Sequence, residues 1–223
     1  MIADNLKEIA STIPSGVTLV AVSKFHPSEA VGEAYQAGQR IFGESRVQEI
    51  SAKAPLLPAD IEWHFIGHLQ TNKVAQLLRV SNLTLIQSID SDRLLRIVDR
   101  EAVKAGRTID VLLELHVADE ETKTGFSVAE LEQWMAERRF ETLEATHIRG
   151  VMGMATNTDD LSRVRNDFRE IRACYDRIIN EIAPDLRRFD TVSMGMSHDY
   201  PVAIGEGATM VRVGTSIFGE RVY

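Results

Sequence analysis

The strongest constraint on the fold is a regular alternation of short apolar runs with helical patterns along the whole chain. Eight runs have the length and apolar character of strands. They lack the apolar–polar alternation of a half-exposed strand, so both faces of each strand are predicted to be buried. The predicted strands are residues 17–22, 40–42, 62–66, 83–89, 109–117, 147–152, 191–193 and 210–213.

Buried strands joined by helices predict an α/β fold with a parallel sheet. Helices are predicted at 27–37, 46–54, 72–80, 91–105, 128–138 and 159–182, with a short one after His198. Eight such units in 223 residues fit a single (β/α)8 TIM barrel with short loops. An open doubly wound sheet is the alternative. Because no Pro- or Ser-rich linker interrupts the chain, one domain is expected over residues 1–223.

The amino-acid composition limits the binding partners and the cellular location that are expected for this protein. The 25 basic and 33 acidic residues give a formal net charge of −8, which disfavours nonspecific binding to nucleic acid or an anionic membrane. No apolar run approaches the ~20 residues of a transmembrane helix, and the first residues lack a signal-peptide core. The single cysteine, Cys174, cannot form an internal disulfide. A cytoplasmic protein is expected, with a monomer as the default oligomeric state.

Lys24 stands out because it directly follows the first predicted strand, in the segment 23–27 (SKFHP). In either architecture, function belongs at the carboxyl ends of the strands. Burial at that point disfavours the charged ammonium and makes the amine a nucleophile that forms Schiff bases with carbonyl compounds. A strand-end lysine whose ammonium simply reaches water is the alternative.

Two loops near the end of the chain carry residues suited to binding phosphate. Barrels frequently bind phosphate through the loops after strands seven and eight. The first loop has Ser193 and Ser197 on either side of a glycine, and the second has Gly214 and Thr215 before a short helical turn. Hydroxyls, a close backbone approach and free N–H groups all favour an anion. Ordinary strand-to-helix turns also use these residue types, which is the alternative.

Arg212 alternates with valines in the last predicted strand and could point into the barrel near this site. Its alternative role is an ion pair with a barrel carboxylate such as Glu114. A nucleophilic lysine that faces a phosphate cradle suggests a phosphorylated aldehyde or ketone as ligand. The candidates are a sugar phosphate, as in Schiff-base aldolases, and pyridoxal phosphate.

Several segments of the chain together resemble the pyridoxal phosphate homeostasis protein family. They follow the order of the family, and the ordered set is far more specific than any single element. The matching segments are 22–24 (VSK), 42–44 (FGE), 47–49 (VQE), 64–73 (HFIGHLQTNK), 123–126 (KTGF), 150–154 (GVMGM), 193–197 (SMGMS), 211–214 (VRVG) and 218–221 (FGER).

The resemblance implies a barrel like the N-terminal domain of alanine racemase, with pyridoxal 5′-phosphate held as a Schiff base on Lys24. It implies that Ser197, Gly214 and Thr215 hold the phosphate. It also implies that Arg212 faces the pyridine nitrogen, where a guanidinium opposes protonation and weakens the ring as an electron sink. The cofactor-binding candidates are Lys24, Ser45, Ser193, Ser197, Arg212, Gly214 and Thr215.

Three functions follow from these residues, and the first is expected. It is a carrier that takes part in intracellular pyridoxal phosphate homeostasis, passes the cofactor to apo enzymes and has no robust catalysis of its own. The second is a small amino-acid racemase, for which no second base can be named. Because the sequence ends at Tyr223, we expect no counterpart of the C-terminal domain that supplies this base in alanine racemase. The third is a Schiff-base sugar-phosphate aldolase, with Glu44 or Glu114 as acid/base.

His64 and His68 are four residues apart, which invites a zinc interpretation. That spacing brings two ligands together only on a helix, and here it spans a strand end and a glycine turn. Both are expected to be structural, and no metal site is predicted. His26 could transfer protons beside Lys24 or cap the turn before Pro27.

Overall fold

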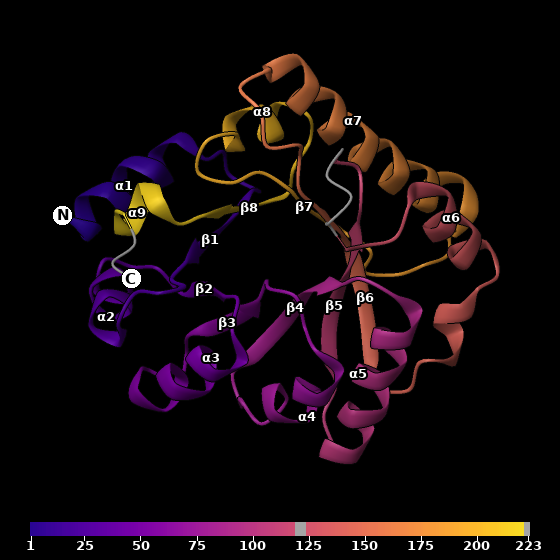
Figure 1. The fold of residues 1–223 in the computed structure, drawn as a ribbon, viewed down its shortest axis with the longest axis horizontal. Helices are drawn as coiled ribbons and strands as arrows, with labels where there is room; N and C mark the ends of the chain where they lie inside the picture. The colour runs from indigo at the N-terminus through magenta and orange to yellow at the C-terminus, as the bar shows by residue number, and fades with distance from the viewer. Residues whose placement is uncertain (119–123, 221–223) are drawn as a thin grey trace.

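The strands form a closed parallel barrel in the computed structural model, which describes residues 1–118 and 124–220 (Figure 1). Lys123 and Arg221, which belong to the matching segments named above, lie outside the described residues. The strands are β1 (Thr18–Val22), β2 (Ile41–Glu44), β3 (Glu62–Phe65), β4 (Leu83–Ile89), β5 (Ile109–Leu115), β6 (Thr146–Gly153), β7 (Thr191–Ser193) and β8 (Met210–Val213).

Each strand pairs in parallel with its sequence neighbours, and β1 closes the ring against β8 with Thr18 opposite Met210. This closure confirms the expected (β/α)8 barrel and excludes the open doubly wound sheet. The second strand continues two residues beyond its predicted end at Phe42, and the fifth stops at Leu115 rather than Val117. Leu115, the last residue of this strand, also forms an isolated bridge to Phe126.

The helices surround the barrel, as Figure 1 shows. The predicted helix 72–80 is a 3₁₀ turn followed by one short α-helix, and the predicted helix 159–182 finishes as a π-helix. The α-helices are α1 (Ile2–Thr12), α2 (Ser28–Gln36), α3 (Val47–Lys53), α4 (Val74–Leu77), α5 (Asp92–Ala105), α6 (Val128–Ala136), α7 (Leu161–Arg177), α8 (Tyr200–Gly205) and α9 (Thr215–Phe218). The 3₁₀ helices are η1 (Ala54–Leu56), η2 (Thr71–Lys73) and η3 (Arg139–Thr142), and the π-helix is η4 (Ile178–Ile182).

Apolar side chains fill two layers, one inside the barrel and one between the barrel and the helices. The larger, outer layer contains the fully buried Phe42, Trp63 and Phe168. Cys174 belongs to this layer, where burial raises the pKa of its thiol to about 12 and makes it an unreactive packing residue. The inner layer consists of Val20, Leu85, Leu112, Met152 and Met210. Because both faces of the sheet are buried, the strands appear in the sequence as apolar runs.

Across the part of the chain that the structure describes, no helix combines the length and the apolar character that crossing a membrane requires.

Candidate functional site

The barrel has a cavity at each mouth, and the charges that line them decide which one suits an anion. At the carboxyl-terminal mouth, a cavity of about 270 Å³ is lined by Lys24 and Arg212, and none of its described lining residues is a carboxylate. At the amino-terminal mouth, a cavity of about 350 Å³ is lined by three carboxylates and the single Arg149. Only the carboxyl-terminal cavity therefore attracts an anionic ligand.

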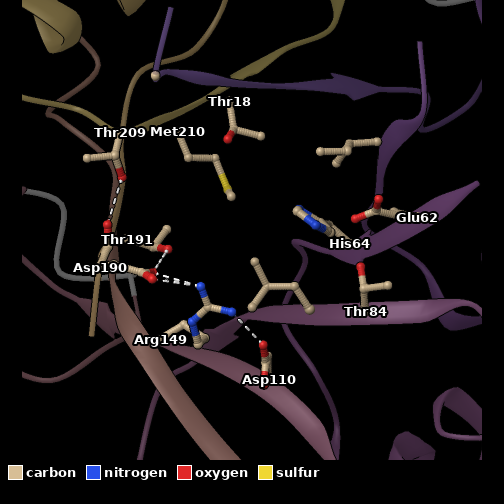
Figure 2. Close-up of a pocket in the computed structure, with 13 residues that line it drawn as sticks. Thr18, Glu62, His64, Thr84, Asp110, Arg149, Asp190, Thr191, Thr209 and Met210 are labelled. Atoms are coloured by element: carbon tan, nitrogen blue, oxygen red, sulfur yellow. Dashed lines mark hydrogen bonds and ion pairs between the residues drawn. The ribbon is translucent and has the colours of Figure 1, made fainter. Parts of the chain in front are cut away.

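Figure 2 shows the amino-terminal cavity, where Arg149 points between Asp110 and Asp190. The guanidinium donates to Asp110 at 2.8 Å and to the two carboxylate oxygens of Asp190 at 2.9 and 2.8 Å. Its Nε donates to the carbonyl of Arg188 at 2.9 Å. Every nitrogen of this guanidinium is engaged, and the contacts join the starts of β5, β6 and β7. These residues stabilise the base of the barrel.

The carboxyl-terminal cavity brings together residues from both ends of the chain. Lys24 and His26 come from the turn after β1, and the His26 ring stacks on Phe218 with the ring centroids 5.2 Å apart. Apolar side chains, among them Val22 and Ile66, form part of the wall. Five residues that the sequence predicted for the site line this one cavity: Lys24, Ser197, Arg212, Gly214 and Thr215.

The two loops predicted to bind phosphate meet each other directly. Ser197, in the loop after β7, accepts a hydrogen bond on Oγ from the backbone N–H of Gly214 at 3.1 Å. Gly214 lies against β1, because a Cβ at this position would come within 3.1 Å of the carbonyl oxygen of Val22. Thr215 follows at the first position of α9. The pair of loops thus forms one polar wall of the cavity.

A series of buried hydrogen bonds holds the Arg212 side chain in place. Its guanidinium donates to the carbonyl of Ser193 at 3.0 Å, to Ser193 Oγ at 2.6 Å and to the carbonyl of Gly153 at 3.0 Å. Because a guanidinium only donates, Ser193 Oγ gives its own proton to Gln87 Oε1, 2.7 Å away. The amide nitrogen of Gln87 is then left to donate to His64 Nδ1 at 2.9 Å, which places the His64 proton on Nε2.

Burial determines the charge states of the residues in and near this series of hydrogen bonds. It lowers the pKa of His64 to about 3, so the ring is neutral, as its hydrogen bond requires. Burial also lowers the pKa of Arg212 to about 10, which keeps the guanidinium charged at neutral pH, and the charge of Glu114 opposes this shift. The contacts of Arg212 go to neutral groups, so Glu114 acts on it only at longer range. Burial raises the pKa of Glu114 to about 7, with Asp90 adding to the shift and Arg212 opposing it.

Two of the sequence-predicted residues lie away from the cavity wall. Ser193 is fully buried beneath Arg212, and it supports the guanidinium from there. Ser45 follows β2 and packs its backbone against Gly67, where an added Cβ would come within 2.2 Å of the Ser45 carbonyl oxygen. Gln87 was not predicted from the sequence, although a polar side chain inside the apolar run 83–89 is a signal that could have identified it.

The two histidines considered as zinc ligands point to different environments. The His64 ring lies inside the barrel, bonded to Gln87, whereas the exposed His68 pairs with Asp90 at 3.2 Å. Within residues 1–118 and 124–220, no group of three or more His, Cys, Asp or Glu side chains is placed to hold a metal ion.

Comparisons with known proteins identify the family of this chain. The family described as "Alanine racemase, N-terminal domain" matches residues 1–222. A pyridoxal phosphate homeostasis protein of Aquifex aeolicus is 41% identical, over 92% of this chain and 87% of its own length. One from Schizosaccharomyces pombe is 38% identical, over 92% of this chain and 84% of its own length.

Among solved structures, PipY of Synechococcus elongatus with PLP bound is 37% identical and superposes with a TM-score of 0.88. The match covers 98% of this chain and 100% of the PipY chain. The similarity therefore extends over both the barrel and the loops at its carboxyl-terminal mouth. The chain belongs to the alanine racemase N-terminal domain family and, within it, to the pyridoxal phosphate homeostasis proteins.

Proposed function

We propose that this protein, acting as a single binding domain, holds pyridoxal 5′-phosphate covalently on Lys24 and serves in its intracellular homeostasis. One observation carries the proposal: Lys24, Arg212 and the two joined loops at Ser197 and Gly214 line the same cationic cavity. The relative with PLP bound in its structure supports the choice of this ligand over a sugar phosphate.

The residues of the cavity fit the parts of the cofactor. The hydroxyls of Ser197 and Thr215 and the backbone at Gly214 would hold the phosphate. Apolar side chains such as Val22 and Ile66 would contact the ring. When bound, the cofactor supplies an aldehyde, which condenses with an unprotonated amine to form a C=N bond with loss of one water.

The character of Arg212 supports binding without robust catalysis. It can donate hydrogen bonds but cannot accept one, so it pairs with a pyridine nitrogen only while that nitrogen is unprotonated. An unprotonated ring is a weak electron sink, which disfavours racemisation of a bound amino acid. Lys24 is partly exposed, so an incoming amine can reach the attachment point. We therefore propose that the protein, as a monomer, releases the cofactor to apo enzymes.

The test is an absorbance spectrum of the purified protein loaded with pyridoxal phosphate, followed by borohydride reduction and mass mapping. We expect one pyridoxyl adduct, on Lys24. Incubation of the loaded protein with an apo enzyme should restore the activity of that enzyme, whereas incubation with L-alanine should give no D-alanine. No adduct, or an adduct on another lysine, would refute the assignment, and rapid racemisation would refute the non-catalytic role.

A further inference from the structure

The turn that carries Lys24 adopts an unfavourable backbone conformation. The backbone N–H of His26 donates to the carbonyl of Ser23 at 3.1 Å, so Lys24 and Phe25 are the central residues of a tight turn. Phe25 has φ +67°, at the position where such a turn usually has glycine. A bulky residue stays in this region only when the surrounding structure holds it there.

Several contacts that hold this turn converge on the side-chain nitrogen of Lys53, at the end of α3, and the Arg46 guanidinium also lies over the Phe25 ring, 4.6 Å from its centroid. Lys53 Nζ donates to the carbonyl of Ser23 at 3.0 Å and to Glu44 Oε1 at 2.6 Å. Its third contact is Glu49 Oε2 at 3.2 Å, and the same oxygen accepts the backbone N–H of Phe25 at 2.8 Å. Ser23 Oγ also donates to Glu44 Oε1, at 2.6 Å. Both residues that flank Lys24 in sequence are therefore tied to Lys53 or to its partners.

The charged side chains of this cluster are largely buried, and removing charged groups from water costs free energy. Glu44 is fully buried and Lys53 is 8% exposed. Burial raises the pKa of Glu44, and the charge and hydrogen bond of Lys53 oppose that rise. Burial also acts to raise the pKa of Glu49, but the hydrogen bonds from Phe25 and Lys53 outweigh it and leave that pKa below its ordinary value. Because a buried ion pair contributes little net stability, its placement behind this turn points to a role in geometry.

The same contacts distinguish Lys53 from Lys24, the two lysines near the carboxyl-terminal cavity. The side-chain nitrogen of Lys53 has three acceptors, in Ser23, Glu44 and Glu49, so the protein itself engages this amine fully. Lys53 does not line the cavity, whereas Lys24 does. Because it lines the cavity, Lys24 is the lysine that an aldehyde bound there would meet.

We propose that Lys53, Glu44 and Glu49 form a positioning cluster that holds the strained turn at Phe25 and thereby aims the Lys24 amine into the cavity. The identity of the aldehyde rests on the function proposed above. The positioning of the turn is a property of the protein alone, and it is measurable without any ligand.

Two variants, Lys53→Met and Glu49→Ala, test the positioning cluster, and Lys104→Met is the matched control. Lys104 is also a helix lysine, but its pair with Glu101 is on the surface, where its side chain is 61% exposed. Glu49→Ala removes the acceptor of the Phe25 N–H and keeps the Lys53–Glu44 pair, so it is the variant that remains folded if Lys53→Met does not. Glu49→Gln restores an acceptor and should behave like the wild type.

The first readout uses the ligand-free protein. Hydrogen exchange at the Phe25 amide should be at least about tenfold faster in Glu49→Ala and Lys53→Met than in the wild type and the control. The second readout is the rate of borohydride-trapped adduct formation on Lys24, which should fall at least about tenfold because the amine is misplaced. Affinity for pyridoxine 5′-phosphate, which lacks the aldehyde, should not change.

Each outcome decides one part of the proposal. Unchanged exchange at Phe25 in Glu49→Ala would overturn the cluster as the support of the turn. Faster exchange with a wild-type adduct rate, or an equal loss of pyridoxine 5′-phosphate binding, would overturn its role in aiming Lys24. A wild-type protein that forms no adduct on Lys24 would refute the proposed function instead, and the exchange at Phe25 would then decide the cluster by itself.

Discussion

An arginine lines the cavity at each mouth of the barrel, and the two guanidinium groups have opposite surroundings. Arg149 is bound by the carboxylates of Asp110 and Asp190, which neutralise it. Arg212 is bound by the hydroxyl and carbonyl of Ser193 and by the carbonyl of Gly153, all of which are neutral. A guanidinium held by neutral acceptors keeps its charge for a ligand. The difference in acceptors therefore distinguishes the proposed binding mouth, at the carboxyl ends of the strands, from the structural mouth at their amino ends.

The largest expected effect comes from removing Lys24, the other basic residue beside Arg212 in the carboxyl-terminal cavity. Lys24→Ala should abolish the covalent adduct and leave only weak binding through the phosphate loops, because no other amine lines the described cavity. Borohydride trapping with mass mapping measures the adduct, and Lys104→Ala is the matched control. Stoichiometric covalent binding at the same site by Lys24→Ala would contradict the assignment.

Glu114 is a carboxyl group whose charge acts on Arg212 at longer range, and this charge depends on pH near neutrality. Its pKa is raised from 4.5 to about 7 in the folded protein, so the folded state holds a proton that the unfolded state releases between these values. The contribution of Glu114 to stability is therefore fully present below pH 4.5 and falls by up to about 3 kcal/mol as pH rises through this window. Glu114→Gln should remove this decline.

Urea denaturation of the wild type and Glu114→Gln at about pH 5 and about pH 8 checks this expectation. The variant should gain stability relative to the wild type at the higher pH. Parallel pH dependences of the two proteins would contradict the assignment of a raised pKa to Glu114.

At the structural mouth, a substitution should change stability and leave ligand binding alone. Arg149→Met leaves Asp110 and Asp190 without their shared cation and should lower the free energy of unfolding by about 2 kcal/mol. Adduct formation on Lys24 should keep its wild-type rate. Arg100→Met, which removes an exposed pair with Glu101, is the control and should cost at most about 0.5 kcal/mol. A slower adduct rate in Arg149→Met would mean that the two mouths are coupled.

The sequence predicted the barrel well, because burial on both faces leaves its signature in every strand. It also predicted that Lys24, Arg212 and the loops at Ser197 and Gly214 lie near one another, as they do around one cavity, since each lies inside a strand or soon after one. It could not say whether a polar residue on a strand lines the cavity or supports a residue that does. Ser193 is in the second situation because the long side chain of Arg212 reaches over it. The sequence also could not predict the positive φ of Phe25, since the residue at that position is not a glycine.

The smallest expected effect tests whether the neutral acceptors hold Arg212 in place. Ser193→Ala removes one hydroxyl, leaves Gln87 Oε1 without its donor and should lower the free energy of unfolding by about 1 kcal/mol. The carbonyls of residue 193 and Gly153 remain, so the guanidinium should keep its position and the loaded protein its absorbance spectrum. Urea denaturation and the spectrum of the loaded protein measure the two effects separately. A changed spectrum at wild-type stability would mean that the hydroxyl itself, and not the pair of carbonyls, sets the direction in which Arg212 presents its charge.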